Sequence, residues 1–365
     1  MINIDFMPSR RIAWYMARLF LTRSAAVLVS LVLILMTLDL LGQSGKILAV
    51  PGNGDADLWR YVGLRIPSLI SFLLPFSVLL GALVAFTGLN QHSEVVSMKA
   101  AGLSAHQILA PMIAASIGVA FALFAFNELV VVKSTRIVNA WDDAEFRAIP
   151  SDSGTMSNIW VREGDDLIHA AQVGGRGAGT TLHGVTIYAR DAGAISRIID
   201  AERGVQVPGG WRLEKIRNFD VATSSLSRAP DMIAMAGVEP NRFTLAKVDP
   251  TTRDFLSLRN AIGELEAAGR PSEEARTGWW HKISGPLSTL LMPLLAATAA
   301  FGLARTGQVL LRASIGMALG FAYFVADNFS IALGNIGAYP PFLAAWAPFL
   351  LFLLIGEFVL IRQEE

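Results

Sequence analysis

Long apolar stretches occupy both ends of the chain, and a more polar stretch separates them. Spanning a hydrocarbon core of about 30 Å takes roughly 20 helical residues. Six segments are long enough: Ile12–Leu41, Ile66–Leu89, Ser104–Val132, Ile283–Ala304, Val309–Leu333 and Phe342–Ile361. The pattern predicts an α-helical membrane protein with six transmembrane helices and one large insert between the third and fourth. Because the number of crossings is even, both termini are expected on the same side.

The polar stretch alternates apolar and polar residues with the period of a β-strand. A hairpin is expected where the segments 160–163 and 167–170 flank Gly164-Asp165-Asp166. The segments 185–190 and 211–214 also alternate, and the turn Pro208-Gly209-Gly210 precedes the second. Several short strands punctuated by glycine predict an all-β domain of the sandwich or jelly-roll type.

The end of the insert changes to a helical pattern. Asp249-Pro250 is a plausible helix start and Gly269 a plausible stop, with apolar residues at helical spacing between them: Phe255, Leu258, Ile262 and Leu265. Together the patterns divide the chain into residues 1–132 (helices 1–3, with a short cytoplasmic helix near 91–102), 133–248 (the β domain), 249–277 (a helix and connector) and 278–365 (helices 4–6).

The distribution of charged residues predicts how the chain is oriented in the membrane. Net charge is zero and charged residues make up 16% of the chain, against about 25% in soluble proteins, so nothing argues for nucleic acid as a partner. Basic residues cluster in one set of short loops, which indicates the cytoplasmic side: Arg10, Arg11, Arg18, Arg23, Lys99, Arg305, Arg312 and Arg362. Both termini are therefore expected in the cytoplasm and the insert outside. The absence of cysteine excludes disulfides and thiolate sites but leaves the compartment open.

Motifs of catalysis are missing from the sequence. It contains no G-x-x-x-x-G-K-[ST] phosphate loop, no H-E-x-x-H pair and no G-x-S-x-G elbow. We therefore expect no ATPase site, metal or cofactor in this chain. Among ionisable residues in apolar segments, Asp327 lies nearest the middle of a helix. It is either part of a polar path or gating contact, or a hydrogen-bonding group between helices.

The most specific motif lies between the second and third segments. Ser93 is placed to cap a short helix, Glu94 follows in its first turn, Val95 and Met98 fall on one side, and Gly102 ends it. Such a helix suits docking into a socket on another protein, although an ordinary interfacial turn would have a similar pattern.

This segment, with Leu79-Leu80-Gly81-Ala82-Leu83 before it, resembles the permeases of the lipopolysaccharide export system, the LptF/LptG family. The likeness covers nearly the whole chain. Residues that resemble the LptG branch more than LptF stand in four places: Asp39-Leu40-Leu41-Gly42, Lys46, Trp211-Arg212-Leu213 and the run from Trp280 to Ser288.

The resemblance implies a permease subunit of an ABC-type exporter in the inner membrane of a Gram-negative bacterium. It would pair with an LptF-type permease around a lipid cavity, while an LptB-type ATPase dimer binds ATP. Residues from Ser93 to Gly102 would form the coupling helix, with Glu94 as its acidic contact. The periplasmic jelly roll would pass lipopolysaccharide to LptC and LptA, by strand addition at its edges.

The phosphates of the lipid should meet basic residues near the outer interface. Related permeases carry several on the first helix, whereas here residues 25–45 have none. Lys46, with Arg60 and Arg65 behind it, is the candidate substrate site; ordinary interfacial anchoring is the alternative. Three other functions stay open: a secondary lipid transporter, a membrane-bound lipid-modifying enzyme and a noncatalytic scaffold.

Overall fold

A computed structural model describes residues 7–147, 156–175, 179–191, 194–244, 248–267, 269–301 and 309–364. The chain divides into two compact units. The first, the helical unit, comprises Met1–Leu48, Asn53–Arg136 and Pro250–Glu365, and the second, the β unit, comprises Ala49–Gly52 and Ile137–Asp249. Arg305, one of the residues used for the orientation argument, lies outside the described residues, as does the end of the predicted segment Ile283–Ala304.

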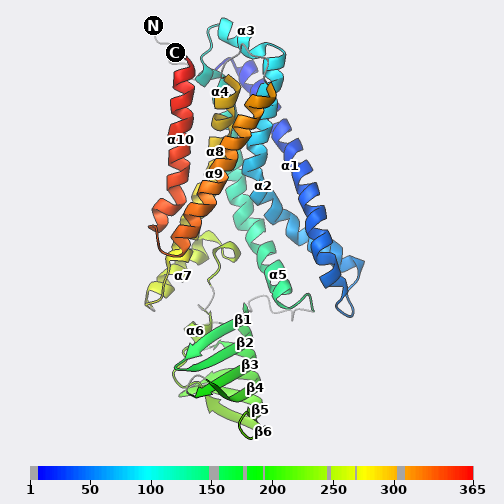
Figure 1. Cartoon of the computed structure of the whole chain (residues 1–365), viewed down its shortest axis with the longest axis vertical. Helices are drawn as coiled ribbons and strands as arrows, with labels where there is room; N and C mark the ends of the chain where they lie inside the picture. Colours follow the sequence, from blue (N-terminus) through cyan, green and yellow to red (C-terminus); the bar gives the residue numbers. More distant parts are fainter. Residues whose placement is uncertain are drawn as a thin grey trace. The chain divides into compact units, whose positions relative to one another are not determined.

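Long helices make up most of the helical unit (Figure 1), and over its described residues each predicted transmembrane segment coincides with one of them. They are α1 (Arg10–Leu48), α2 (Asp55–Gln91), α4 (Ala105–Phe126), α8 (Glu273–Phe301), α9 (Val309–Asn335) and α10 (Pro341–Glu364). In the part of the chain that the structure describes, five helices are long and apolar enough to cross a membrane: Arg10–Leu48, Asp55–Gln91, Ala105–Asp143, Ser314–Asn335 and Pro341–Arg362. A membrane protein with apolar helices on both sides of an insert is thereby confirmed.

The remaining predicted crossing, α8, is the central helix of the bundle. It packs against α2, α4, α9 and α10, and its residues from Leu294 to Ala297 are almost fully buried. Small residues let neighbouring helices approach closely. A Cβ atom on Gly356 of α10 would collide with Leu294 of α8, and one on Gly81 of α2 would collide with Ser24 of α1.

The third helix is longer than predicted. It continues from α4 through a π-helical turn (Asn127–Val131) into α5 (Val132–Asp143), so the expected end at Val132 is wrong. Beyond that residue the helix is amphipathic rather than uniformly apolar, with Val138 and Trp141 buried. A search for continuous apolar runs therefore misses its last turns.

The β unit holds an antiparallel sheet, which confirms the inserted β domain. Its described strands are β1 (Met156–Glu163), β2 (Asp166–Gly174), β3 (Thr181–Asp191), β4 (Ala194–Val207), β5 (Gly210–Asp220) and β6 (Ser225–Ala234). The predicted hairpin is β1–β2, closed by Gly164-Asp165 with Glu163 paired to Asp166. In the described residues the strands lie in sequential order in one six-stranded sheet. Each strand pairs with its sequence neighbour, so this part of the domain has meander connections where a jelly roll has Greek keys.

One side of the sheet is closed by the chain that follows β6. Trp211 is fully buried, packs edge-on against Phe243 of α6 (Pro240–Thr244) with ring centroids 5.2 Å apart, and donates its indole N–H to the Val238 carbonyl at 2.7 Å. This satisfies the polar atom of a large buried side chain. The sheet therefore has one packed face and one open face.

The helix predicted after the β domain begins later than expected. Pro250–Thr252 form only a 3-10 turn, and α7 runs from Phe255 to Ala267. Asp254 caps it, because its carboxylate accepts the Ser257 N–H at 2.8 Å. This hydrogen bond lowers the pKa of Asp254. Gly269 has a φ of +62° and ends the helix as predicted.

Candidate functional site

The short helix between α2 and α4 is present and is labelled α3 (Glu94–Ala100). It lies at the end of the helical unit where α10 ends, opposite the end that carries α7 (Figure 1). Gly102 has a φ of +87° just after it, which is the glycine stop that the sequence predicts. Ser93 stands at the N-cap position with a φ of 59°, but its side chain makes no capping hydrogen bond. The predicted serine cap is therefore wrong; a left-handed residue turns the chain into the helix instead.

The two apolar residues predicted for docking face the protein's own interior. Val95 is 5% exposed and Met98 packs against the core of the bundle. Val96, by contrast, is 59% exposed. The outward surface of α3 is therefore formed by different residues from those that periodicity selected, and Val96 is the apolar residue that a partner would meet first.

Glu94 connects α3 to the first helix. The Tyr15 hydroxyl of α1 donates a hydrogen bond to Glu94 Oε1 at 3.2 Å. Residues 79 positions apart are thereby linked across the end of the bundle, and the Glu94 carboxylate stays partly exposed. Sequence reasoning identified Glu94 but not its partner, because Tyr15 reads as an ordinary interfacial aromatic residue.

The three candidate basic residues lie around the turn between α1 and α2 but differ in their surroundings. Lys46 is exposed in the last turn of α1, and Arg60 is exposed near the start of α2. Arg65 is partly buried, and its guanidinium pairs with Asp39 of α1, with Nε 3.1 Å from Oδ2. The same carboxylate oxygen accepts the Tyr61 hydroxyl at 2.7 Å. Lys46 is thus more open to a ligand than Arg65.

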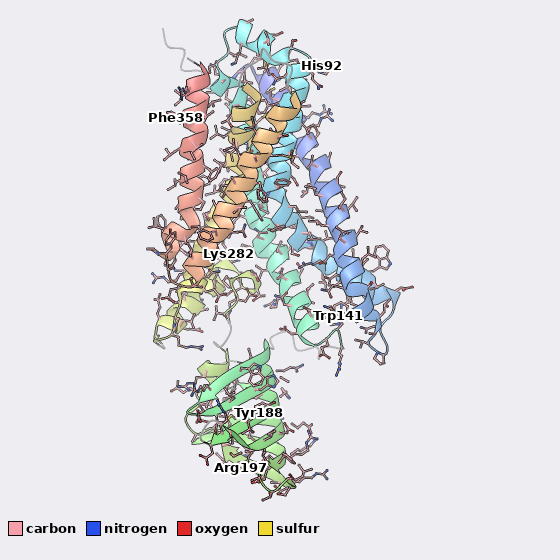
Figure 2. The ribbon with its side chains drawn as sticks, viewed as in Figure 1. His92, Trp141, Tyr188, Arg197, Lys282 and Phe358 are labelled. Carbon is pink, nitrogen blue, oxygen red and sulfur yellow. The ribbon has the colours of Figure 1, made fainter. Side chains whose placement is uncertain are left out.

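A partly buried ion pair, which the sequence did not predict, lies away from α3, toward the end of the bundle that carries the α1–α2 turn. Glu128, in the π-helical turn, accepts a hydrogen bond from the Lys282 ammonium of α8 at 2.7 Å, and the two side chains are only 15% and 12% exposed. Glu128 also accepts the backbone N–H of Phe255, at the start of α7. One carboxylate therefore joins three helical elements. Figure 2 shows Lys282 on α8. A π-helical turn is the structural signal that marks this site.

Asp327 faces a neighbouring helix. Its carboxylate lies 4.0 Å from the imidazole Nε2 of His281 on α8, and it is 14% exposed. His281 is also within 3.4 Å of the Ser284 hydroxyl. The contact joins α9 to α8, but at 4.0 Å it is longer than the interhelical hydrogen bond that one of the two interpretations of Asp327 expected. Across the described residues, no group of three or more His, Asp or Glu side chains is arranged to hold a metal ion.

Known proteins resemble this chain, which combines a helical bundle, an inserted sheet and a short helix with a partly exposed glutamate. The model of the family described as lipopolysaccharide export system permease LptF/LptG matches residues 14–362. The chain belongs to the LptF/LptG family. It is 25% identical over 354 residues to the lipopolysaccharide export system permease protein LptG of Escherichia coli K12, covering 93% of each chain. It is 24% identical over 339 residues to LptG of Haemophilus influenzae, covering 86% of this chain and 89% of that protein.

Membership in the LptF/LptG family confirms the resemblance seen in the sequence. The match includes both groups of helices and the sheet between them. The relatives named here are LptG proteins, in keeping with the expected branch.

Proposed function

We propose that this chain is the LptG-type permease subunit of an exporter that extracts lipopolysaccharide from the inner membrane and passes it to a periplasmic bridge. The proposal rests on one observation, the match to the permease family from residue 14 to residue 362. The helices supply the membrane part and the β unit supplies a domain outside it. Both termini and α3 would face the cytoplasm, and the β unit would face the periplasm.

The energy for export would come from another protein. The sequence has no phosphate loop, so ATP would be bound by an LptB-type ATPase dimer and this subunit would carry no cofactor of its own. An LptF-type permease would complete the lipid cavity, and LptC and LptA would receive the lipid. We assign the chain a transport role and no catalytic one.

Coupling between ATPase and permease would run through α3. Ser93, Glu94, Val95, Met98 and Gly102 form or delimit this helix. The exposed Val96 and the partly exposed Glu94 would meet the ATPase, while Val95 and Met98 pack against the bundle and would hold the helix in place. Because Tyr15 contacts Glu94, a movement of α3 would act on α1 directly as well as on α2 and α4.

Substrate phosphates would be contacted at the other end of α1. Lys46 and Arg60 are the more exposed of the three candidates, and Arg65 would act mainly by holding α1 against α2 through Asp39. This arrangement allows a charged headgroup to reach Lys46 without breaking an existing ion pair.

The coupling proposal is tested at Glu94 in the assembled complex. We expect Glu94→Lys to abolish co-purification of the ATPase and Glu94→Ala to weaken it, since a charge-assisted contact typically contributes about 1.5–3 kcal/mol. Thr22→Ala is the control outside α3, because the exposed Thr22 hydroxyl bonds to carbonyls of its own helix, those of Arg18 and Leu19. Normal ATPase recovery and lipopolysaccharide release in both Glu94 variants would disprove the assignment. A chain that transports lipid with no ATPase present would favour a secondary transporter.

A further inference from the structure

In four neighbouring strands of the β sheet, the alternation of buried and unburied residues is interrupted at the same level. In one stretch of each strand from β2 to β5, buried and unburied residues alternate except at one place, where two consecutive residues are not buried; the stretches are 168–173, 182–187, 199–204 and 211–216. These pairs are 171–172, 183–184, 202–203 and 214–215, and each is followed or preceded by a buried residue. We call this line the crease.

The strand register shows that the crease is continuous. Gln172 pairs with His183, His183 with Arg203, and Arg203 with Glu214. Two residues on the crease have left-handed backbones, Gly184 with a φ of 60° and Lys215 with a φ of 55°. A non-glycine residue in this region costs roughly 1 kcal/mol or more. The strand register is the same on both sides of the crease, so the departure is shared by neighbouring strands and is not a β-bulge of one strand.

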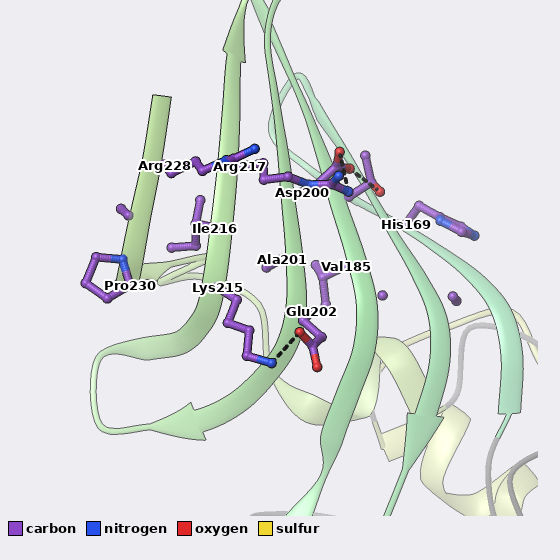
Figure 3. A pocket seen from close by; sticks show the side chains of 14 residues that line it. His169, Val185, Asp200, Ala201, Glu202, Lys215, Ile216, Arg217, Arg228 and Pro230 are labelled. Carbon is purple, nitrogen blue, oxygen red and sulfur yellow. Dashed lines mark hydrogen bonds and ion pairs between the residues drawn. The ribbon is translucent and has the colours of Figure 1, made fainter. Parts of the chain in front are cut away.

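A cavity of about 900 Å³ opens beside the crease. Its lining combines small and apolar residues, Ala171, Gly184, Val185, Ala201, Ile216, Ala229 and Pro230, with polar side chains from β2 to β6 (Figure 3). Those side chains are His169, Thr186, Asp200, Glu202, Lys215, Arg217 and Arg228. The volume lies within the range of roughly 300–1,000 Å³ that is usual for small-ligand sites.

The charges around the cavity are largely paired. Lys215 Nζ lies 2.7 Å from Glu202 Oε2, and Asp200 accepts the Thr186 hydroxyl at 2.9 Å while lying 3.7 Å from Arg217. The hydrogen bond to Glu202 raises the pKa of Lys215, so that pair stays charged. A site built for a bare anion would present unopposed cations. This one presents donors and acceptors in alternation.

Aromatic rings border the polar row. The ring of Trp160 stacks on that of Tyr188, with centroids 5.8 Å apart and 17° between the planes, and lies 4.6 Å from the His169 ring. Trp160 is 50% exposed. Burial lowers the pKa of His169, which leaves its imidazole neutral at pH 7. The open face therefore joins an exposed aromatic surface to a row of hydrogen-bonding groups.

We propose that this cavity binds the saccharide part of the exported glycolipid. Sugar rings have hydroxyl groups that both donate and accept hydrogen bonds, and C–H faces that pack on aromatic rings. Paired Asp–Arg and Glu–Lys side chains offer both kinds of partner, and Trp160 with Tyr188 offers the apolar surface. Apolar residues of the lining, Val185, Ile216 and Pro230, give the C–H faces of a sugar further surface to pack on. The inference rests on the proposed function, which supplies a substrate that carries a polysaccharide.

The test uses the full permease complex in nanodiscs and, as probe, the lipid-free oligosaccharide released from lipopolysaccharide by mild acid. We expect binding by titration calorimetry, with a Kd raised about tenfold or more by Arg217→Ala or Asp200→Ala, because each removes a hydrogen-bonding charge. Arg212→Ala is the matched control on the same strand. Arg212 is exposed and outside the cavity lining, so its removal should leave the Kd within about twofold.

Several results would overturn the saccharide proposal. One is failure of the oligosaccharide to bind, and another is an equal Kd in the cavity and control variants. Inorganic phosphate binding more tightly than the oligosaccharide would also contradict the proposal. So would an acylation experiment in which a partner protein, and not the oligosaccharide, protects Lys215. The same preparations are assayed for ATP-dependent lipopolysaccharide release. If the complex releases lipopolysaccharide but does not bind the oligosaccharide, only the cavity assignment is disproved. If the complex neither contains the ATPase nor releases the lipid, the proposed function is disproved.

Discussion

Two basic side chains within 20 residues of each other illustrate how surroundings decide the role of a charge. Arg65 shares Asp39 with the Tyr61 hydroxyl between α1 and α2, while Lys46 is exposed in the last turn of α1. A paired charge contributes to helix packing, and an exposed charge is available to a ligand. The two residues should therefore respond differently to substitution.

We expect Lys46→Asp to lower crosslinking of lipopolysaccharide to the permease without lowering its thermal midpoint. Arg65→Ala should instead lower the midpoint, because Asp39 then remains partly buried with the Tyr61 hydroxyl but without its charged partner, at a cost of about 1–3 kcal/mol. Thermal unfolding in detergent and photo-crosslinking of labelled lipid measure the two effects separately. The conservative variant Lys46→Arg is the control and should retain crosslinking; unchanged crosslinking in Lys46→Asp would place the phosphate site elsewhere.

Individual residues could be identified from the sequence more readily than the residues that they contact. Glu94 and Gly102 were recognised from their positions in the α3 motif, but the Tyr15 contact joins residues 79 positions apart. Local spacing carries no information about such pairs. At Ser93 the residue type itself was misleading. Serine favours the capping position of a helix, but Ser93 has a φ of 59° and its side chain makes no capping hydrogen bond.

The π-helical turn at residues 127–131 joins two neighbouring elements through one side chain. Glu128 binds Lys282 of α8 and the first N–H of α7. This contact fixes the connector helix to the bundle.

Removing only one charge of this pair should be worse than removing both. We expect Lys282→Met to destabilise the protein by about 3 kcal/mol, because Glu128 would be left as an uncompensated, mostly buried charge. The double variant Glu128→Gln with Lys282→Met should recover part of the loss, since the neutral amide still accepts the Phe255 N–H. Thermal midpoints of the four proteins form a double-mutant cycle, and strictly additive effects would show that the pair is not coupled.

Element boundaries were predictable where one physical signal dominates. Apolar runs located α1, α2 and α10, and the Gly164-Asp165 turn located the first hairpin. However, α1 continues past the expected Leu41 to Leu48, and α2 begins at Asp55, well before the expected Ile66. The end of the third helix was missed because its last turns are amphipathic. The crease across the sheet was also missed, because Gly184 alone suggests a turn and only the pairing of four strands shows what it does.

Considered as a whole molecule, the chain buries its first helix less than the other described helices that are apolar enough to cross a membrane. Only 11% of an apolar 18-residue window of α1 is made up of buried residues, against 56% of the corresponding window of α2. The exposed side chains on α1 are large and apolar: Val29, Leu33, Ile34, Leu38 and Leu41. An apolar surface of this kind is satisfied by lipid or by another helix, and in the proposed exporter it would face the cavity shared with the partner permease.

This assignment can be tested without altering the rest of the protein, because the sequence contains no cysteine. A photo-reactive maleimide on Leu33→Cys, where the native side chain is 63% exposed, should crosslink to the partner permease or to lipopolysaccharide. Met36→Cys is the control on the same helix. Met36 is only 6% exposed, so its thiol should react slowly and give internal products. Adducts of ordinary phospholipid alone at Leu33→Cys would show that this face of α1 lies against the bilayer, and the cavity would have to be formed by other helices.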